Sequence, residues 1–273
     1  MSTVGLELEW ADIDRHAIIS PELGIWNQLD YTIVNSNGHA NHPRGEYPLG
    51  GEINTVPTIT AGEQAEIVRQ LAEQLNPTIN YRTNLHVHVK PDVDLTKDVE
   101  LLKKVAMYFW ESEAFVYSNV EPIPKPLPED YPDPEAWAGA MKRYRRRLVS
   151  HHYTLPYFRR QELLEAVTPD DVRDAHAPPK EDGGRSWHIA PRPGMNLRSL
   201  WKHGTIEYRH FPGTADPEKI ESCCEWAKRF TDAAIAGEPR PEVIWASRMW
   251  RIPEFRPYIH ELEVGFQATR FKK

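Results

Sequence analysis

The feature that most limits how this chain can fold is a two-residue alternation of apolar and ionisable residues. In "VGLELEW", residues 4–10, the alternation sends Leu6 and Leu8 to one face of a β-strand, and Glu7 and Glu9 to the other. Two carboxylates so placed lie about 7 Å apart and repel by roughly 2 kcal/mol at an effective dielectric constant near 20. For one such segment, the commoner explanation is an amphipathic strand with a wet face.

The same alternation returns in later segments. In "TNLHVHVKP", His86 and His88 leave one face of a strand whose other face is aliphatic, and "GTIEYRHFPGT", residues 204–214, places Glu207 and Arg209 together. Glu52 follows a glycine turn in "PLGGEINTVP". Each pattern also has an ordinary explanation, a solvated histidine pair or a weak ion pair. Together they predict ionisable side chains gathered on one face of a sheet.

The predicted fold class is α+β, a curved and mainly antiparallel sheet with helices packed on one face. Three helices are expected. The capping-box pair Thr60 and Glu63 indicates the start of the first, the second runs from about residue 96 to 117, and the third has Asp216 as its N-cap and Pro217 at its first helical position. Prolines between residues 122 and 134 forbid both helix and central strand, and predict a stiff surface insertion near 121–134.

Composition narrows the class of protein. The 273 residues, 40% of them hydrophobic, predict a single domain over residues 1–273. A net charge of -7 disfavours nucleic acid as a partner, and the absence of a long apolar run or a secretory signal predicts a cytoplasmic protein without a membrane partner. Cys223 and Cys224 are adjacent and exclude a disulfide framework and a four-cysteine zinc site, so both are expected to be buried helix residues.

Four carboxylates on one face need cations. Oxygen ligands outnumber imidazoles in this set and thiolates are absent, which favours magnesium or manganese over zinc. The neighbouring Arg209 indicates a phosphate group nearby.

The segments "GLELEW", "GGEINTVP", "NLHVHV" and "GTIEYRHFPGT", in this order, resemble the motifs of the amidoligase family. That family is similar to the catalytic domain of glutamine synthetase and to glutamate-cysteine ligase, and the resemblance runs from Gly5 to about Ala236. It implies a glutamine synthetase catalytic-domain-like fold and an ATP-dependent carboxylate-amine ligase that forms amide bonds through an acyl phosphate. The implied cofactors are ATP and Mg²⁺ or Mn²⁺, and the implied partners are small-molecule or peptide carboxylates and amines.

The resemblance also implies roles for single residues. Glu9 and Glu52 resemble the residues that hold a metal at the substrate end. The residues that resemble the ligands of a second metal, which bridges the ATP phosphates, are Glu7, His86 and Glu207. Nucleotide or acyl-phosphate contacts are implied for Arg209, for Arg198 in "MNLRSLW", and for His88, which could instead orient a neighbour. Arg209, Arg198 and Glu52 are the implied catalytic residues.

The chain departs from glutamine synthetase in two respects. It has no counterpart to that enzyme's small N-terminal domain, and it shows only Glu52 where that enzyme offers two acids. Asp30 or Glu46 could supply the second.

The basic stretch "MKRYRRRLVSHHYTLPYFRR", residues 141–160, has three interpretations: a solvated helix face, a site for substrate carboxylates, or a polyanion contact that the acidic chain disfavours.

Two rival functions remain open as well. One is a metal-dependent hydrolase, although the sequence has no H-E-x-x-H helix, and the other is a non-catalytic nucleotide-binding relative.

Overall fold

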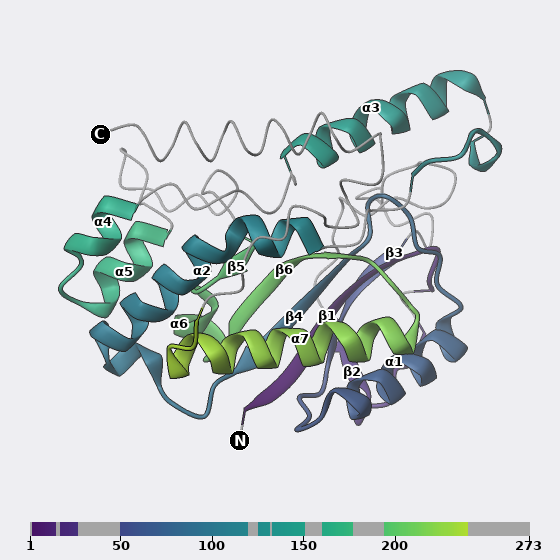
Figure 1. Ribbon diagram of the computed structural model, residues 1–273. Helices are drawn as coiled ribbons and strands as arrows, with labels where there is room; N and C mark the ends of the chain where they lie inside the picture. The colour runs from purple at the N-terminus through teal and green to yellow at the C-terminus, as the bar shows by residue number, and fades with distance from the viewer. Residues whose placement is uncertain are drawn as a thin grey trace. The chain divides into compact units, whose positions relative to one another are not determined.

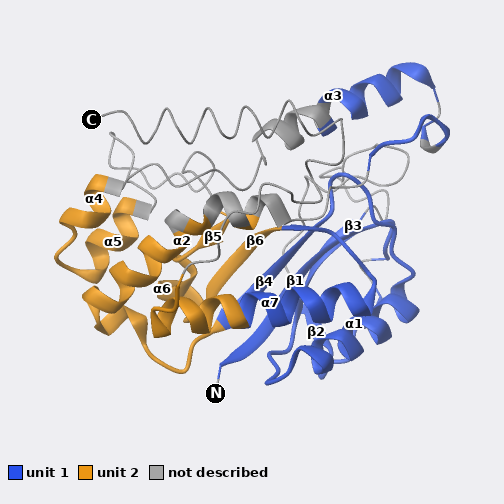
Figure 2. Ribbon diagram, viewed as in Figure 1, with its two compact units in different colours: residues 1–89, 122–147, 211–228 blue, residues 90–121, 148–210, 229–273 orange. Residues whose placement is uncertain are grey.

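The structure is a computed structural model that describes residues 2–14, 17–26, 50–119, 125–131, 133–150, 160–176 and 194–239. The chain divides into two compact units (Figure 2). Unit 1 comprises residues 1–89, 122–147 and 211–228, and unit 2 comprises residues 90–121, 148–210 and 229–273. The prediction of a single domain over 1–273 stays a prediction.

Within the described residues, six strands form one open sheet in the order β2-β3-β1-β4-β6-β5 (Figure 1). The strands are β1 (Thr3–Ala11), β2 (Gly24–Trp26), β3 (Gly50–Thr55), β4 (Asn84–Lys90), β5 (Met195–Asn196) and β6 (Ile206–Pro212). The pairs β1–β3, β2–β3 and β5–β6 are antiparallel. The α+β class with a mainly antiparallel sheet is thereby confirmed, while the likeness to the glutamine synthetase catalytic domain stays a prediction.

In unit 1, helix α1 (Ala61–Leu75) contacts β1. The predicted capping box is present. The Thr60 hydroxyl accepts a hydrogen bond from the backbone N–H of Glu63, and the Glu63 carboxylate accepts one from the backbone N–H of Thr60. On β1, Leu6, Leu8 and Trp10 are almost fully buried, as the alternation predicts for the face opposite the acids.

The C-terminal end of β6 is tied to the other strands of unit 1 at a turn. The backbone N–H of Gly213 donates to the Thr83 carbonyl at 3.2 Å, and the Trp10 indole donates to the Thr214 carbonyl at 3.0 Å. Thr83 is itself fully buried and donates its hydroxyl to the Asn80 carbonyl at 2.8 Å. These bonds fix the start of β4 against the end of β6 and the apolar face of β1.

In unit 2, the expected helix from residue 96 is two elements. A 3-10 turn, η1 (Leu95–Lys97), is capped by Asp94, and α2 (Val99–Asn119) follows after Asp98, whose carboxylate accepts from the backbone N–H of Leu101. Two caps in close succession interrupt the helix, because each one starts a new set of backbone hydrogen bonds.

Several described elements of unit 2 contact α2 or the 3-10 turn before it. The short helices α4 (Arg160–Glu165) and α5 (Pro169–His176) contact it, α6 (Ser199–His203) contacts η1, and the Phe109 ring of α2 meets Tyr208 and Phe230 at 5.9 and 5.7 Å between centroids. This aromatic cluster is the core of the unit.

Helix α7 (Pro217–Ala236) passes from unit 1 into unit 2 and begins as predicted, with the Asp216 carboxylate accepting from the Glu218 N–H at 3.0 Å. Cys224 is fully buried, but Cys223 is only half-buried, so the prediction of two buried cysteines is wrong for Cys223, because successive residues of a helix point about 100° apart and cannot both lie at the centre of one buried face.

The proline-rich insertion contains, in its described part, the 3-10 turn η2 (Pro128–Asp130), followed by α3 (Pro134–Ser150). No helix among the described residues is long and apolar enough to cross a membrane.

Replacing Gly213 with alanine should destabilise the fold by roughly 1–3 kcal/mol, the usual result of overpacking. The added Cβ would lie 2.6 Å from the Cβ and 2.8 Å from the carbonyl carbon of Thr83. The matched control is Gly62→Ala in α1, where the nearest atom is a Glu221 oxygen at 3.4 Å; helix propensity should leave that variant as stable as wild type or slightly more so. Urea unfolding of the three proteins tests this, and equal midpoints would contradict the close approach of Gly213 to Thr83.

Candidate metal centre

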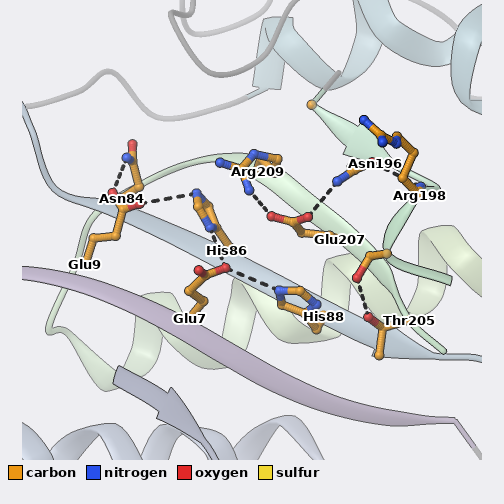
Figure 3. A network of polar contacts seen from close by, with 12 residues as sticks. Glu7, Glu9, Asn84, His86, His88, Asn196, Arg198, Thr205, Glu207 and Arg209 are labelled. Atoms are coloured by element: carbon orange, nitrogen blue, oxygen red, sulfur yellow. Dashed lines mark hydrogen bonds and ion pairs between the residues drawn. The ribbon is translucent and has the colours of Figure 1, made fainter. Parts of the chain in front are cut away.

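Three acids share one face of unit 1. Glu7 and Glu9 project from β1 on the same side (Figure 3), and the β1–β3 register places Glu52 directly opposite Glu9. Glu9 and Glu52 are buried, with 4% and 9% of their surface exposed, whereas 18% of the Glu7 side chain remains exposed. Carboxylates so close to one another and to the protein interior require positive charge or donors nearby.

His86 of β4 lies between the two acids of β1 and supplies part of the hydrogen bonding that these carboxylates need. Its Nδ1 lies 2.8 Å from Glu7 Oε2, its Nε2 lies 3.8 Å from Glu9 Oε1, and only 1% of the residue is exposed. His88, two residues further along the same face, has Nε2 3.5 Å from Glu7 Oε2. A protonated His86 would attract both carboxylates and so offset the repulsion between Glu7 and Glu9. The sequence predicts that divalent cations alone offset that repulsion.

The environment of Glu7 favours its ionised form. Burial raises the pKa of the Glu7 carboxyl, but the charge of His86 and hydrogen bonds with His86, His88 and Glu52 outweigh burial and hold that pKa well below its ordinary value of 4.5. Glu7 is thereby kept as a carboxylate, the form that binds a cation.

Asn84 is a site residue that the sequence analysis did not identify. It begins β4, has 5% of its surface exposed, and donates its side-chain N–H to Glu9 Oε2. A signal for it exists in the sequence, because Asn84 precedes His86 by two residues and therefore leaves the same face of the strand.

In unit 2, Glu207 is held on both of its oxygens. Arg209 Nη1 donates to Oε1, and Asn196 Nδ2 donates to Oε2 at 2.7 Å, while the side-chain oxygen Oδ1 of Asn196 accepts from the backbone N–H of Arg198 at 3.0 Å (Figure 3). Glu207 has 6% of its surface exposed. The predicted pair of Glu207 and Arg209 is therefore present as an ion pair, with Asn196 as a further partner.

The acids Glu7, Glu9 and Glu52 of unit 1 share the face from which His86 and His88 project, and both imidazoles lie near Glu7 Oε2, with His86 Nδ1 at 2.8 Å and His88 Nε2 at 3.5 Å. Both histidines leave the same face of β4, so the two-residue period could not rank them as ligands. Carboxylate oxygens with an imidazole nitrogen suit manganese and, with added water, magnesium.

The metal, nucleotide and catalytic roles assigned from the resemblance stay predictions, including those of Glu52 and Arg198. Asp30 and Glu46 lie outside the described residues. In the basic stretch, Lys142 is exposed and Tyr144 is buried on α3, and the side chains of the other basic residues lie outside the described part. All three interpretations of that stretch therefore stay open.

The chain belongs to the amidoligase family. The model of a family described as "Putative amidoligase enzyme" matches residues 28–231, which confirms the resemblance and supports a ligase acting on small molecules. No curated protein and no solved structure matches the chain. The matched segment includes Glu52, both histidines of β4 and Glu207, but it begins after β1, so Glu7 and Glu9 lie outside it.

Glu7→Gln should destabilise the metal-free protein by roughly 1–3 kcal/mol near neutral pH, because the two histidines would lose a charged acceptor. The folded pKa of Glu7 is depressed, so its contribution is complete above the unfolded pKa and is lost as the pH falls through the folded pKa. The difference from wild type should therefore shrink in acid. Urea unfolding at neutral and acidic pH measures it, with Glu225→Gln on the exposed face of α7 as the control. A Glu7→Gln variant more stable than wild type would show that repulsion from the other carboxylates dominates.

Proposed function

We propose that this protein is an ATP-dependent carboxylate-amine ligase that uses Mg²⁺ or Mn²⁺. The observation that carries the proposal is the cluster of acids and imidazoles in unit 1, where His86 Nδ1 and His88 Nε2 lie 2.8 and 3.5 Å from Glu7 Oε2 and Glu52 stands opposite Glu9; unit 2 adds the ion pair of Glu207 with Arg209. Membership in the amidoligase family supports the ligase class. Two carboxylates and an arginine are the chemistry that a magnesium-bound triphosphate requires.

The residues present fit divalent cations of this kind. By the family resemblance, Glu7, His86 and Glu207 would hold a cation at the phosphate end, and Glu9 and Glu52 would hold one at the substrate end. Bound there, the cations would neutralise the charge of the triphosphate.

In the proposed reaction, a substrate carboxylate oxygen attacks the γ-phosphorus of ATP, ADP leaves, and an acyl phosphate forms. The amine nitrogen then attacks the acyl carbon, inorganic phosphate leaves with the electrons of the C–O bond, and the nitrogen loses a proton to phosphate or water, which completes the amide. Arg209 would hold phosphate oxygens through its planar guanidinium, and Arg198 would make a second phosphate contact. The ion pair with Glu207 keeps the Arg209 guanidinium in place before nucleotide arrives.

The function is tested by ADP release from the purified protein supplied with ATP, Mg²⁺ and a pool of amino acids and amines. A ligase should release ADP only when carboxylate and amine are both present, and excess chelator should abolish release. A hydrolase would need no ATP, and a non-catalytic relative would bind nucleotide without turnover. ATP binding in calorimetry that is unchanged by excess chelator would contradict the role of the metal.

Arg209→Lys should lower kcat by about tenfold or more, because lysine cannot bond two phosphate oxygens from a planar fork. The fold should persist, since lysine can still pair with Glu207. Arg229→Lys, an exposed position of α7, is the matched control and should leave kcat unchanged. Wild-type turnover by Arg209→Lys would reduce Arg209 to a structural partner of Glu207.

A further inference from the structure

The side chain of Asn196 joins two predicted site residues of unit 2. Its Nδ2 donates to Glu207 Oε2 at 2.7 Å, and its Oδ1 accepts from the backbone N–H of Arg198 at 3.0 Å. The β5–β6 register places Asn196 directly opposite Glu207, so the contact follows from the antiparallel pairing of the two strands.

The orientation of this amide is fixed by chemistry. A carboxylate only accepts hydrogen bonds and a backbone N–H only donates them, so the NH₂ group must face Glu207 and the oxygen must face Arg198. The opposite orientation would lose both bonds. Asn196 is therefore a rigid link between the Glu207 carboxylate and the backbone at Arg198.

The link holds Glu207 by both of its carboxylate oxygens. Arg209 donates to Oε1 and Asn196 donates to Oε2, and an ionised carboxylate oxygen can accept more than one bond. The two donors therefore fix the plane of the carboxylate from both ends. Because only 6% of Glu207 is exposed, water competes little with these donors for its orientation.

We propose that Asn196 is a positioning residue that holds Glu207 in the orientation required to bind a divalent cation. This inference rests on the proposed function, in which Glu207 is a metal ligand. Asn196 itself touches neither the cation nor the substrate, and it acts through Glu207 in the way that outer partners of metal ligands do elsewhere.

Calorimetric titration with Mn²⁺ alone tests the inference on the full chain. Asn196→Ala should weaken Mn²⁺ binding by about 10–100-fold, the usual effect of removing a partner of a metal ligand. Glu207→Gln should weaken it at least as much. The matched control is Ser199→Ala, which removes the 2.8 Å hydrogen bond to Thr205 close by in the chain and should keep wild-type affinity. Asn196→Leu, of similar size and suited to a strand, replaces the alanine variant if that one does not fold.

The outcomes separate this inference from the function on which it rests. If wild type binds Mn²⁺, Glu207→Gln does not, and Asn196→Ala binds as wild type does, the positioning role is overturned and the proposed function stands. An Asn196→Ala protein that melts at a lower temperature but binds Mn²⁺ with wild-type affinity would show a merely structural role and overturn the inference. Failure of wild type to bind Mn²⁺ would overturn the metal in the proposed function and this inference with it.

Discussion

The placement of His86 between Glu7 and Glu9 is the interaction on which the polar face of unit 1 depends. Each imidazole nitrogen faces a carboxylate of β1, at 2.8 and 3.8 Å, in surroundings where the histidine is 1% exposed. A buried carboxylate without such a partner is strongly destabilising. The geometry requires β4 in one register, because a slip of one residue would send His86 to the apolar face and an aliphatic residue toward the acids.

That register is held by bonds made away from the acids. Gly213 approaches Thr83 so closely that no side chain fits between them, and the Trp10 indole anchors the same turn from the apolar face of β1. Burial of Leu6, Leu8 and Trp10 stabilises this face of the sheet, each large side chain contributing on the order of 2 kcal/mol. The apolar side of the strand thus offsets the desolvation of the carboxylates on its other side.

Local features of the fold could be predicted from the sequence, whereas partners across strands could not. The alternation on β1 and β4, the capping box at Thr60 and the N-cap at Asp216 depend on residues within a few positions of one another. The bonds of Asn84 to Glu9 and of Asn196 to Glu207 depend on strand register, which joins residues 75 and 11 positions apart. A pattern confined to β4 likewise cannot decide which of His86 and His88 would bind a metal, because both imidazoles leave the same face of the strand and both lie near Glu7 Oε2.

The position of β1 explains why the family match and the site do not coincide. The matched segment, residues 28–231, contains β3 and β4, yet the strand that lies between them in the sheet is β1, which precedes the segment. Without β1, the edge of β3 that pairs with it would expose its backbone N–H and C=O groups, and Glu52 would lose the strand that places Glu9 opposite it. His86 would likewise keep its place on β4 but lose both carboxylates that it contacts. The N-terminal strand is therefore required by the matched segment for sheet pairing and for charge compensation alike, and Glu7 and Glu9 belong with the acids that the segment itself contains.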